Sequence, residues 1–180
     1  MTTDFVIVRM AAAALAVVFA VGAWHKVRDL AAFEGVVTAY DLVPPVAAVW
    51  VAWSIPVAEI FAALCLVGDS SRTLGAYVGG GLLVFVTGAI VLNLWRGRRA
   101  IDCGCGGIED EVHLSWALVA RNAVLGAACL ALLDPASGRD MGWLDYLTVG
   151  VGAGCMYGLY ATFNQMLANA PRLARLRGAA

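Results

Sequence analysis

Two cysteines separated by a single glycine are the residues whose spacing most clearly suggests chemistry. Cys103 and Cys105 lie in the run Asp-Cys-Gly-Cys-Gly, within the most polar connection between apolar segments. A disulfide between cysteines this close in sequence requires a tight backbone turn, which Gly104 permits. So small a ring is strained and exchanges readily, a property that suits redox catalysis. The spacing therefore favours a thiol-disulfide oxidoreductase with Cys103 and Cys105 as its catalytic residues.

Other uses of this cysteine pair stay open. With His113 and a carboxylate such as Asp102 or Glu109, the pair could bind zinc, whose usual protein ligands are thiolates, imidazoles and carboxylates. One cysteine pair is only half of the usual structural set, so the sequence favours no metal site. The pair could also belong to an inert, reduced loop. The alternative function is then a non-catalytic assembly or transport factor that binds a client protein or zinc through residues 96–113.

Polar residues near the cysteines could support thiol chemistry. Arginine near a thiol favours the thiolate, which is the form that attacks disulfides, whereas a carboxylate opposes it. Arg121 allows two interpretations: it neutralises a carboxylate such as Glu59 or Asp102, or it lies in a polar pocket beneath the cysteines. In that pocket it would stabilise a thiolate or the carbonyl oxygen of a bound quinone. The supporting residues are Asn93, Arg96, Asp102, Arg121 and Asn122.

Two further charges fall inside apolar segments, where a charged side chain is costly and needs a partner. Arg9 and Glu59 lie at similar depths, measured from the same ends of their segments. The sequence therefore predicts a structural ion pair between Arg9 and Glu59.

The remaining cysteines lie within apolar segments, where a thiol usually acts as a small apolar side chain. Cys65 and Cys129 are both near segment ends on the side away from the Cys-Gly-Cys loop. If they formed a second redox pair, most of a bilayer would separate it from the loop. A mobile carrier such as a quinone would then have to connect the two pairs.

The elements that position these residues follow from an unusually apolar composition. The chain has 180 residues, of which 62% are hydrophobic and 14% charged, and its mean hydropathy is +0.81. Soluble domains have about 25% charged residues. The net charge of −1 provides no basic surface for nucleic acid. The composition predicts an integral membrane protein whose first partner is the lipid bilayer.

Five segments are long and apolar enough to cross a bilayer, since a helical span needs roughly 20 apolar residues. They are residues 5–24, 45–67, 74–95, 114–133 and 143–167. We expect an all-α integral membrane protein with a four-helix transmembrane bundle in residues 1–133. A fifth, C-terminal transmembrane helix and a short basic tail occupy residues 134–180. Residues 29–40 are the one candidate for an amphipathic surface helix.

Glycines recur at every fourth residue in two of these segments, a spacing that lets membrane helices approach closely. They are Gly75 and Gly79 in the third segment and Gly150, Gly154 and Gly158 in the fifth. We expect these glycines to lie at helix contacts.

The orientation follows from the basic residues in the connections, because positive charge is enriched on the cytoplasmic side. One side has Arg72 and Arg139 only. The sequence therefore predicts an outer N-terminus, with the C-terminus and the Cys103/Cys105 loop in the cytoplasm. The basic residues of that side are Lys26, Arg28, Arg96, Arg98, Arg99, Arg172, Arg175 and Arg177.

The chain resembles the methylamine utilisation MauE family over about residues 5–133. The resemblance lies in the run Asn-Leu-Trp-Arg-Gly-Arg-Arg-Ala-Ile-Asp-Cys-Gly-Cys-Gly of residues 93–106, and in residues 116–122. It also includes Gly-Ala-Trp-His-Lys at 22–26, residues 33–44, and Pro-Val-Ala-Glu at 56–59. The Asp-Cys-Gly-Cys-Gly core is its most specific part.

This resemblance implies a four-helix membrane protein related in helix layout to the DoxX type, with Cys103 and Cys105 as the functional pair. The family is associated with maturation of the disulfide-rich small subunit of methylamine dehydrogenase, beside a thioredoxin-like partner. It thus implies a protein of the inner or plasma membrane that assists maturation of exported disulfide-bearing client proteins. Two features depart from the family: Gly107 replaces a frequent aromatic residue, and the fifth segment lies outside the family region.

Overall fold

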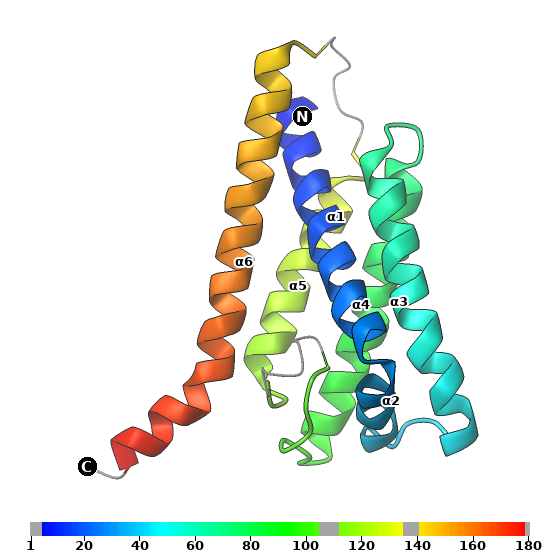
Figure 1. Cartoon of the computed structure of the whole chain (residues 1–180), viewed down its shortest axis with the longest axis vertical. Coiled ribbons are helices and arrows are strands. Elements are labelled where there is room, and N and C mark those ends of the chain that lie inside the picture. The colour runs from blue at the N-terminus through cyan, green and yellow to red at the C-terminus, as the bar shows by residue number, and fades with distance from the viewer. Residues whose placement is uncertain (1–4, 105–111, 135–140, 179–180) are drawn as a thin grey trace.

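The computed structural model describes residues 5–104, 112–134 and 141–178, and over these residues the chain is helical (Figure 1). A single residue, Asp29, separates the first two helices. It follows the last residue of α1 and caps α2, where its side chain accepts a hydrogen bond from the Ala32 amide at 2.9 Å. The helices are α1 (Phe5–Arg28), α2 (Leu30–Ala39), α3 (Pro45–Val67), α4 (Arg72–Trp95), α5 (Trp116–Ala131) and α6 (Trp143–Gly178).

The helix lengths and compositions fit a membrane protein. Three helices, α1, α3 and α4, are long and apolar enough to cross a bilayer, and α2 and α5 are shorter apolar helices. Large apolar side chains cover their outer faces, among them Trp50, Val84 and Trp95. The predicted all-α membrane fold is confirmed at this level. Helix α5 is shorter than the predicted span of residues 114–133, because the Leu114 amide bonds to the Ile101 carbonyl before the helix begins.

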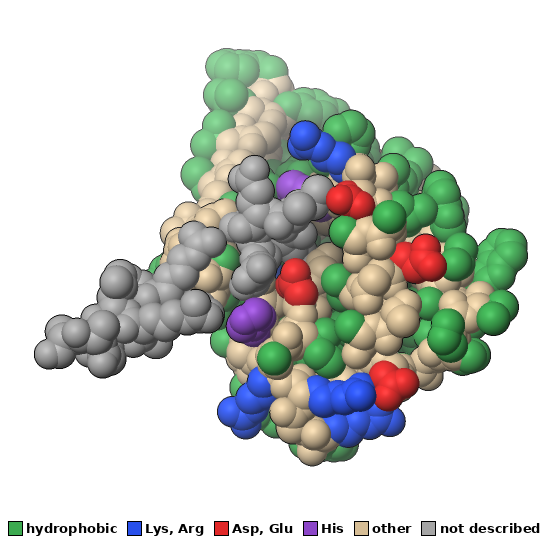
Figure 2. All heavy atoms as spheres, turned by 60° about the horizontal axis from the view of Figure 1, so that its bottom comes forward, with side chains coloured by type: hydrophobic (Ala, Val, Ile, Leu, Met, Phe, Trp, Pro, Cys, Tyr) green, Lys and Arg blue, Asp and Glu red, His purple; other side chains and the backbone are tan. Residues whose placement is uncertain are grey.

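The helices place the connections at two opposite ends of the molecule (Figure 1). The N-terminus and the turn between α3 and α4 lie at one end. Helix α2, the start of α5 and residues 96–104 lie at the other, which we call the loop end. Lysine and arginine side chains gather at the loop end (Figure 2), and Arg28, Arg96 and Arg98 are exposed there.

Small residues set the distances between helices, as predicted for α4 but not for α6. A Cβ atom on Gly75 would lie 2.8 Å from the Leu66 backbone nitrogen, and one on Gly79 would lie 2.6 Å from the Phe19 ring. These glycines let α4 approach α3 and α1. The prediction for α6 is wrong: Gly150, Gly154 and Gly158 have open space beside them, and α6 instead contacts Met10 of α1 through Gly152. The contact face of α6 is therefore rotated away from the expected glycine row.

Candidate functional site

A cavity of about 130 Å³ lies inside the bundle, at the level where α1 ends and α2 begins. Its wall is mostly apolar and includes residues of all six helices. The polar or ionisable side chains in the wall are Lys26, Tyr40, Glu59, Cys103, Arg121, Asn122 and Tyr160. The cavity thus brings together three of the residues singled out from the sequence: Cys103, Arg121 and Asn122.

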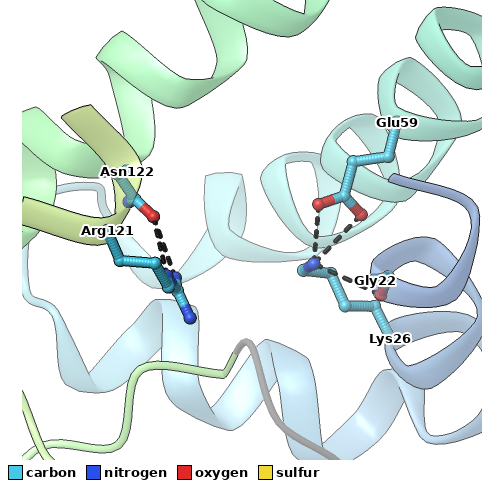
Figure 3. Close-up of polar contacts among 5 residues, drawn as sticks. All are labelled: Gly22, Lys26, Glu59, Arg121 and Asn122. Atoms are coloured by element: carbon cyan, nitrogen blue, oxygen red, sulfur yellow. Dashed lines mark hydrogen bonds and ion pairs between the residues drawn. The ribbon is translucent and has the colours of Figure 1, made fainter. Parts of the chain in front are cut away.

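One side of the cavity carries a buried ion pair between α1 and α3 (Figure 3). The Lys26 Nζ atom donates to both Glu59 carboxylate oxygens, at 2.7 and 3.0 Å, and to the Gly22 carbonyl oxygen at 3.3 Å. It also lies 5.6 Å from the centroid of the Phe33 ring of α2. The two charged side chains are only 7% and 13% exposed, so each depends on the other for stabilisation.

This arrangement corrects the predicted Arg9–Glu59 pair. Arg9 instead pairs with Asp69, in the turn after α3, and Glu59 pairs with Lys26. Depth alone misassigned the partners because Lys26 follows the predicted segment of residues 5–24 and was counted among the connections. In the structure α2 packs against α3 at the loop end (Figure 1), and Lys26, near the end of α1, is buried with Glu59.

The opposite side of the cavity is formed by a polar network around Arg121. Its Nε and Nη2 atoms donate to the Asn122 Oδ1 atom at 3.1 and 2.9 Å, and its Nη1 atom donates to the Asn164 Oδ1 atom at 2.9 Å. The guanidinium carbon lies 5.7 Å from the Tyr160 ring centroid. Asn122 donates in turn to the Thr87 hydroxyl at 3.0 Å. Arg121 thereby connects α4, α5 and α6.

Sequence reasoning missed several members of these two groups. Lys26, Thr87 and Tyr160 were not singled out as site residues. A signal existed for Asn164, because it is an amide in an otherwise apolar segment. No such signal existed for Lys26, because it follows the predicted segment of residues 5–24.

Cys103 lies where the chain enters the loop, with its side chain buried against the cavity. The two ends of the loop are joined at this point by backbone pairing. The Cys103 amide donates to the Val112 carbonyl at 2.9 Å, and Asp102 and His113 form an isolated antiparallel bridge. The second cysteine of the pair, Cys105, belongs to residues 105–111, outside the described residues. This backbone pairing holds Cys103 in the cavity wall at the start of the loop.

The described residues do not bring Cys103, Asp102 and His113 together, and the other two candidate zinc ligands, Cys105 and Glu109, lie outside them. Side chains alternate across an extended backbone, so Asp102 and His113 face away from Cys103. His113 is exposed, whereas Cys103 is buried. Within residues 5–104, 112–134 and 141–178, no group of three or more potential metal ligands gathers.

Three of the supporting residues, Asn93, Arg96 and Asp102, lie outside the cavity wall. Asn93 is fully buried in α4, where its Nδ2 atom donates to the Ala89 carbonyl at 3.1 Å. Arg96 follows α4 at the loop end, and its guanidinium donates to the Asp41 carbonyl at 3.3 Å. Asp102 accepts a hydrogen bond from the Gly104 amide at 3.4 Å. These contacts hold the loop end together.

The remaining cysteines are distributed through the bundle. Cys129 is buried in the core beside Gly80 of α4, Cys65 is half-buried in α3, and Cys155 is exposed on α6. All three are thiols in this structure. Cys129 therefore packs as a small apolar side chain, and it forms no disulfide with Cys65.

Gly104 should be sensitive to substitution. Its φ angle is +68°, and a Cβ atom would lie 3.1 Å from Val36 and 3.2 Å from the Phe33 ring. Alanine disfavours this backbone conformation by about 1 to 2 kcal/mol. We expect Gly104→Ala to lower the thermal midpoint of the purified protein. Gly97→Ala is the matched control, because Gly97 also has a positive φ angle, +76°, but open space around it. Equal losses in both variants would contradict a contact with α2.

The family model and the similar proteins found by comparison all carry the same name. The sequence model of the family described as methylamine utilisation protein MauE matches residues 4–134. A methylamine utilization protein MauE from Paracoccus versutus is 39% identical over 148 residues, covering 81% of this chain and 79% of that protein. Proteins of the same name from Paracoccus denitrificans and Methylorubrum extorquens are 38% and 35% identical, over 66% and 80% of this chain and 63% and 80% of their own lengths. No solved structure matches.

Proposed function

Because the chain belongs to the methylamine utilisation protein MauE family, we propose that it is a membrane thiol/disulfide redox protein in methylamine utilisation. In this function Cys103 and Cys105 form the exchanging pair. They assist maturation of exported disulfide-bearing proteins of the methylamine dehydrogenase small-subunit type. A thioredoxin-like protein is the proposed partner in thiol exchange.

One observation carries this proposal: Cys103 shares a cavity with Arg121 and Asn122. A cation in the wall of the same cavity favours the thiolate. The backbone pairing of Cys103 with Val112 fixes Cys103 in the cavity wall. Gly104, which has a positive φ angle, precedes Cys105 in the sequence. A thiol site is thus supported by a fixed first cysteine, a cation in the same cavity wall and a glycine turn.

We further propose that residues 1–133 form a four-helix membrane domain and that residues 134–180 add a fifth span with a basic tail. The MauE match ends just before α6, in agreement with this division. Helix α6 nevertheless contributes Tyr160 and Asn164 to the Arg121 network. The proposed location is the inner or plasma membrane, with the loop end in the cytoplasm.

The redox proposal predicts that the loop cysteines titrate together. Purified protein is equilibrated in graded thiol/disulfide buffers, quenched with acid and alkylated with a mass tag. We expect both Cys103 and Cys105 to carry the tag in reducing buffers and neither to carry it in oxidising buffers. The two should change together over a narrow range of potential. Cys155→Ser serves as the control, because Cys155 is exposed on α6 and should not affect the transition.

Loop cysteines that stay reduced throughout the series would contradict the redox proposal. Zinc analysis of the same sample would then separate a metal-binding assembly factor from an inert loop.

The proposed orientation predicts protection of the loop cysteines in intact cells. A membrane-impermeant maleimide should leave reduced Cys103 and Cys105 unlabelled before lysis and label them afterwards, because basic residues place the loop end in the cytoplasm. Mass spectrometry of the loop peptide measures the labelling. Labelling before lysis would reverse the orientation without affecting the redox proposal.

A further inference from the structure

The cavity has the size and polarity of a site for one small ring. Its volume of about 130 Å³ is close to that of an engineered apolar cavity of about 150 Å³ that binds benzene. Two polar groups face each other across it, Lys26 and Glu59 on one side and Arg121 and Asn122 on the other (Figure 3). Apolar side chains form most of the wall between them. A ligand that fits must be apolar in its middle and polar at two opposite ends.

The chemistry of the Lys26–Glu59 group limits the ligand further. Glu59 and Lys26 neutralise each other, so this end of the cavity has no net charge to attract an ionic ligand. The pair offers a donor and an acceptor 2.7 Å apart, so it can bind an oxygen both as a carbonyl and as a hydroxyl. The bond from Lys26 to the Gly22 carbonyl, at 3.3 Å, is longer than its two bonds to Glu59 and can be exchanged for a bond to a ligand.

The Arg121 group provides the second polar end. Its hydrogen bonds to Asn122 and Asn164 run to neutral amide oxygens and fix the guanidinium in place. A guanidinium has five N–H donors and no acceptor, so this end suits an oxygen that accepts hydrogen bonds. Together the two ends fit a ring with oxygens at opposite positions.

The cavity also reaches the outer surface of the bundle. Leu42 and Phe85 line it, yet these residues are 36% and 57% exposed. Phe85 lies in α4, one of the helices long enough to span the membrane. A ligand could therefore enter sideways from the hydrocarbon interior and leave an apolar tail there.

From these features we propose that the cavity binds the ring of a membrane-dissolved para-quinone. One ring oxygen lies at Lys26 and Glu59, and the other lies at Arg121. For its chemistry this inference rests on the proposed function, because oxidation of the Cys103/Cys105 dithiol to a disulfide releases two electrons and two protons. These convert the two quinone carbonyls to the two hydroxyls of a quinol. Cys103 belongs to the same wall, so the proposed dithiol and the ring share one cavity.

Binding of ubiquinone-1, a quinone with a short tail, tests the site on the full-length protein in detergent. Isothermal titration calorimetry should show saturable binding at one site. Ala89→Phe, which fills the cavity from α4, should abolish binding, and Arg121→Gln should weaken it by about tenfold through loss of one charged donor. Cys155→Ser, outside the cavity wall, should bind like the original protein.

Cys103→Ser separates this inference from the proposed function, because it removes the thiol chemistry and should retain quinone binding. The quinone site is overturned if ubiquinone-1 does not bind, or if Ala89→Phe binds it as well as the original protein does. Octanoate in place of the quinone tests for a single-ended anion site, and its tighter binding would also overturn the inference. Quinone binding together with inert loop cysteines would instead refute only the redox function.

Discussion

Replacing Glu59 with glutamine should destabilise the protein by about 3 to 5 kcal/mol, the usual cost of removing one partner from a buried ion pair. Lys26 would keep its charge or lose its proton inside an apolar wall, and both outcomes cost free energy. The pair also connects α1 to α3, so its loss should weaken the packing of these two helices, which both line the cavity. Unfolding in a denaturing detergent, followed by circular dichroism, measures the change.

The double variant Lys26→Met/Glu59→Gln should recover most of this loss, because no unpaired charge remains. Asp69→Asn is the matched control: it breaks the ion pair between α1 and the turn after α3, whose side chains are 22% (Arg9) and 57% (Asp69) exposed and so more accessible to water than Lys26 and Glu59. An exposed pair contributes about 0 to 1 kcal/mol. If Glu59→Gln cost no more than Asp69→Asn, or if the double variant were the least stable, the ion pair would not stabilise the bundle as we infer.

The sequence was sufficient to predict the helical segments because a bilayer imposes a single requirement on them, a run of apolar residues of fixed length. The ends of the segments depended on local bonds that hydropathy does not report. The Asp29 cap begins α2, and the backbone pairing of Leu114 with Ile101 delays the start of α5. Residues 29–40 were correctly identified as a helix candidate, but the burial of Phe33 gives α2 a role in the cavity wall.

The sequence could predict which site residues lie at the same side of the membrane. Cys103, Arg121 and Asn122 were expected at the same side of the membrane, and they line one cavity. The partner of Glu59 could not be chosen correctly, because depth along a helix carries no information about rotation around its axis. For the same reason the glycine spacing in α6 predicted the wrong face, and contact with α1 occurs at Gly152.

Replacing Arg121 with glutamine should slow alkylation of Cys103 by about tenfold at neutral pH. A nearby positive charge favours a thiolate by one or more pKa units, and each unit changes the thiolate fraction tenfold. The rate of reaction with a small maleimide, measured against pH in a Cys105→Ser background, should keep its shape and move to higher pH. Glutamine preserves a hydrogen-bonding end, and removal of the charge should make insertion of α5 easier.

Two further substitutions distinguish a local charge effect from a general loss of structure. Arg121→Lys retains the charge but not the planar guanidinium, so its pH profile should stay close to the original even if the bonds to Asn122 and Asn164 weaken. Arg96→Gln removes a charge from the loop end, where Arg96 bonds to the Asp41 carbonyl, and should leave the profile unchanged. If Arg96→Gln shifted the profile as much as Arg121→Gln, the relevant charge would be the loop end as a whole. If Arg121→Gln and Arg121→Lys both lost folded protein, Arg121 would act by holding α4, α5 and α6 together.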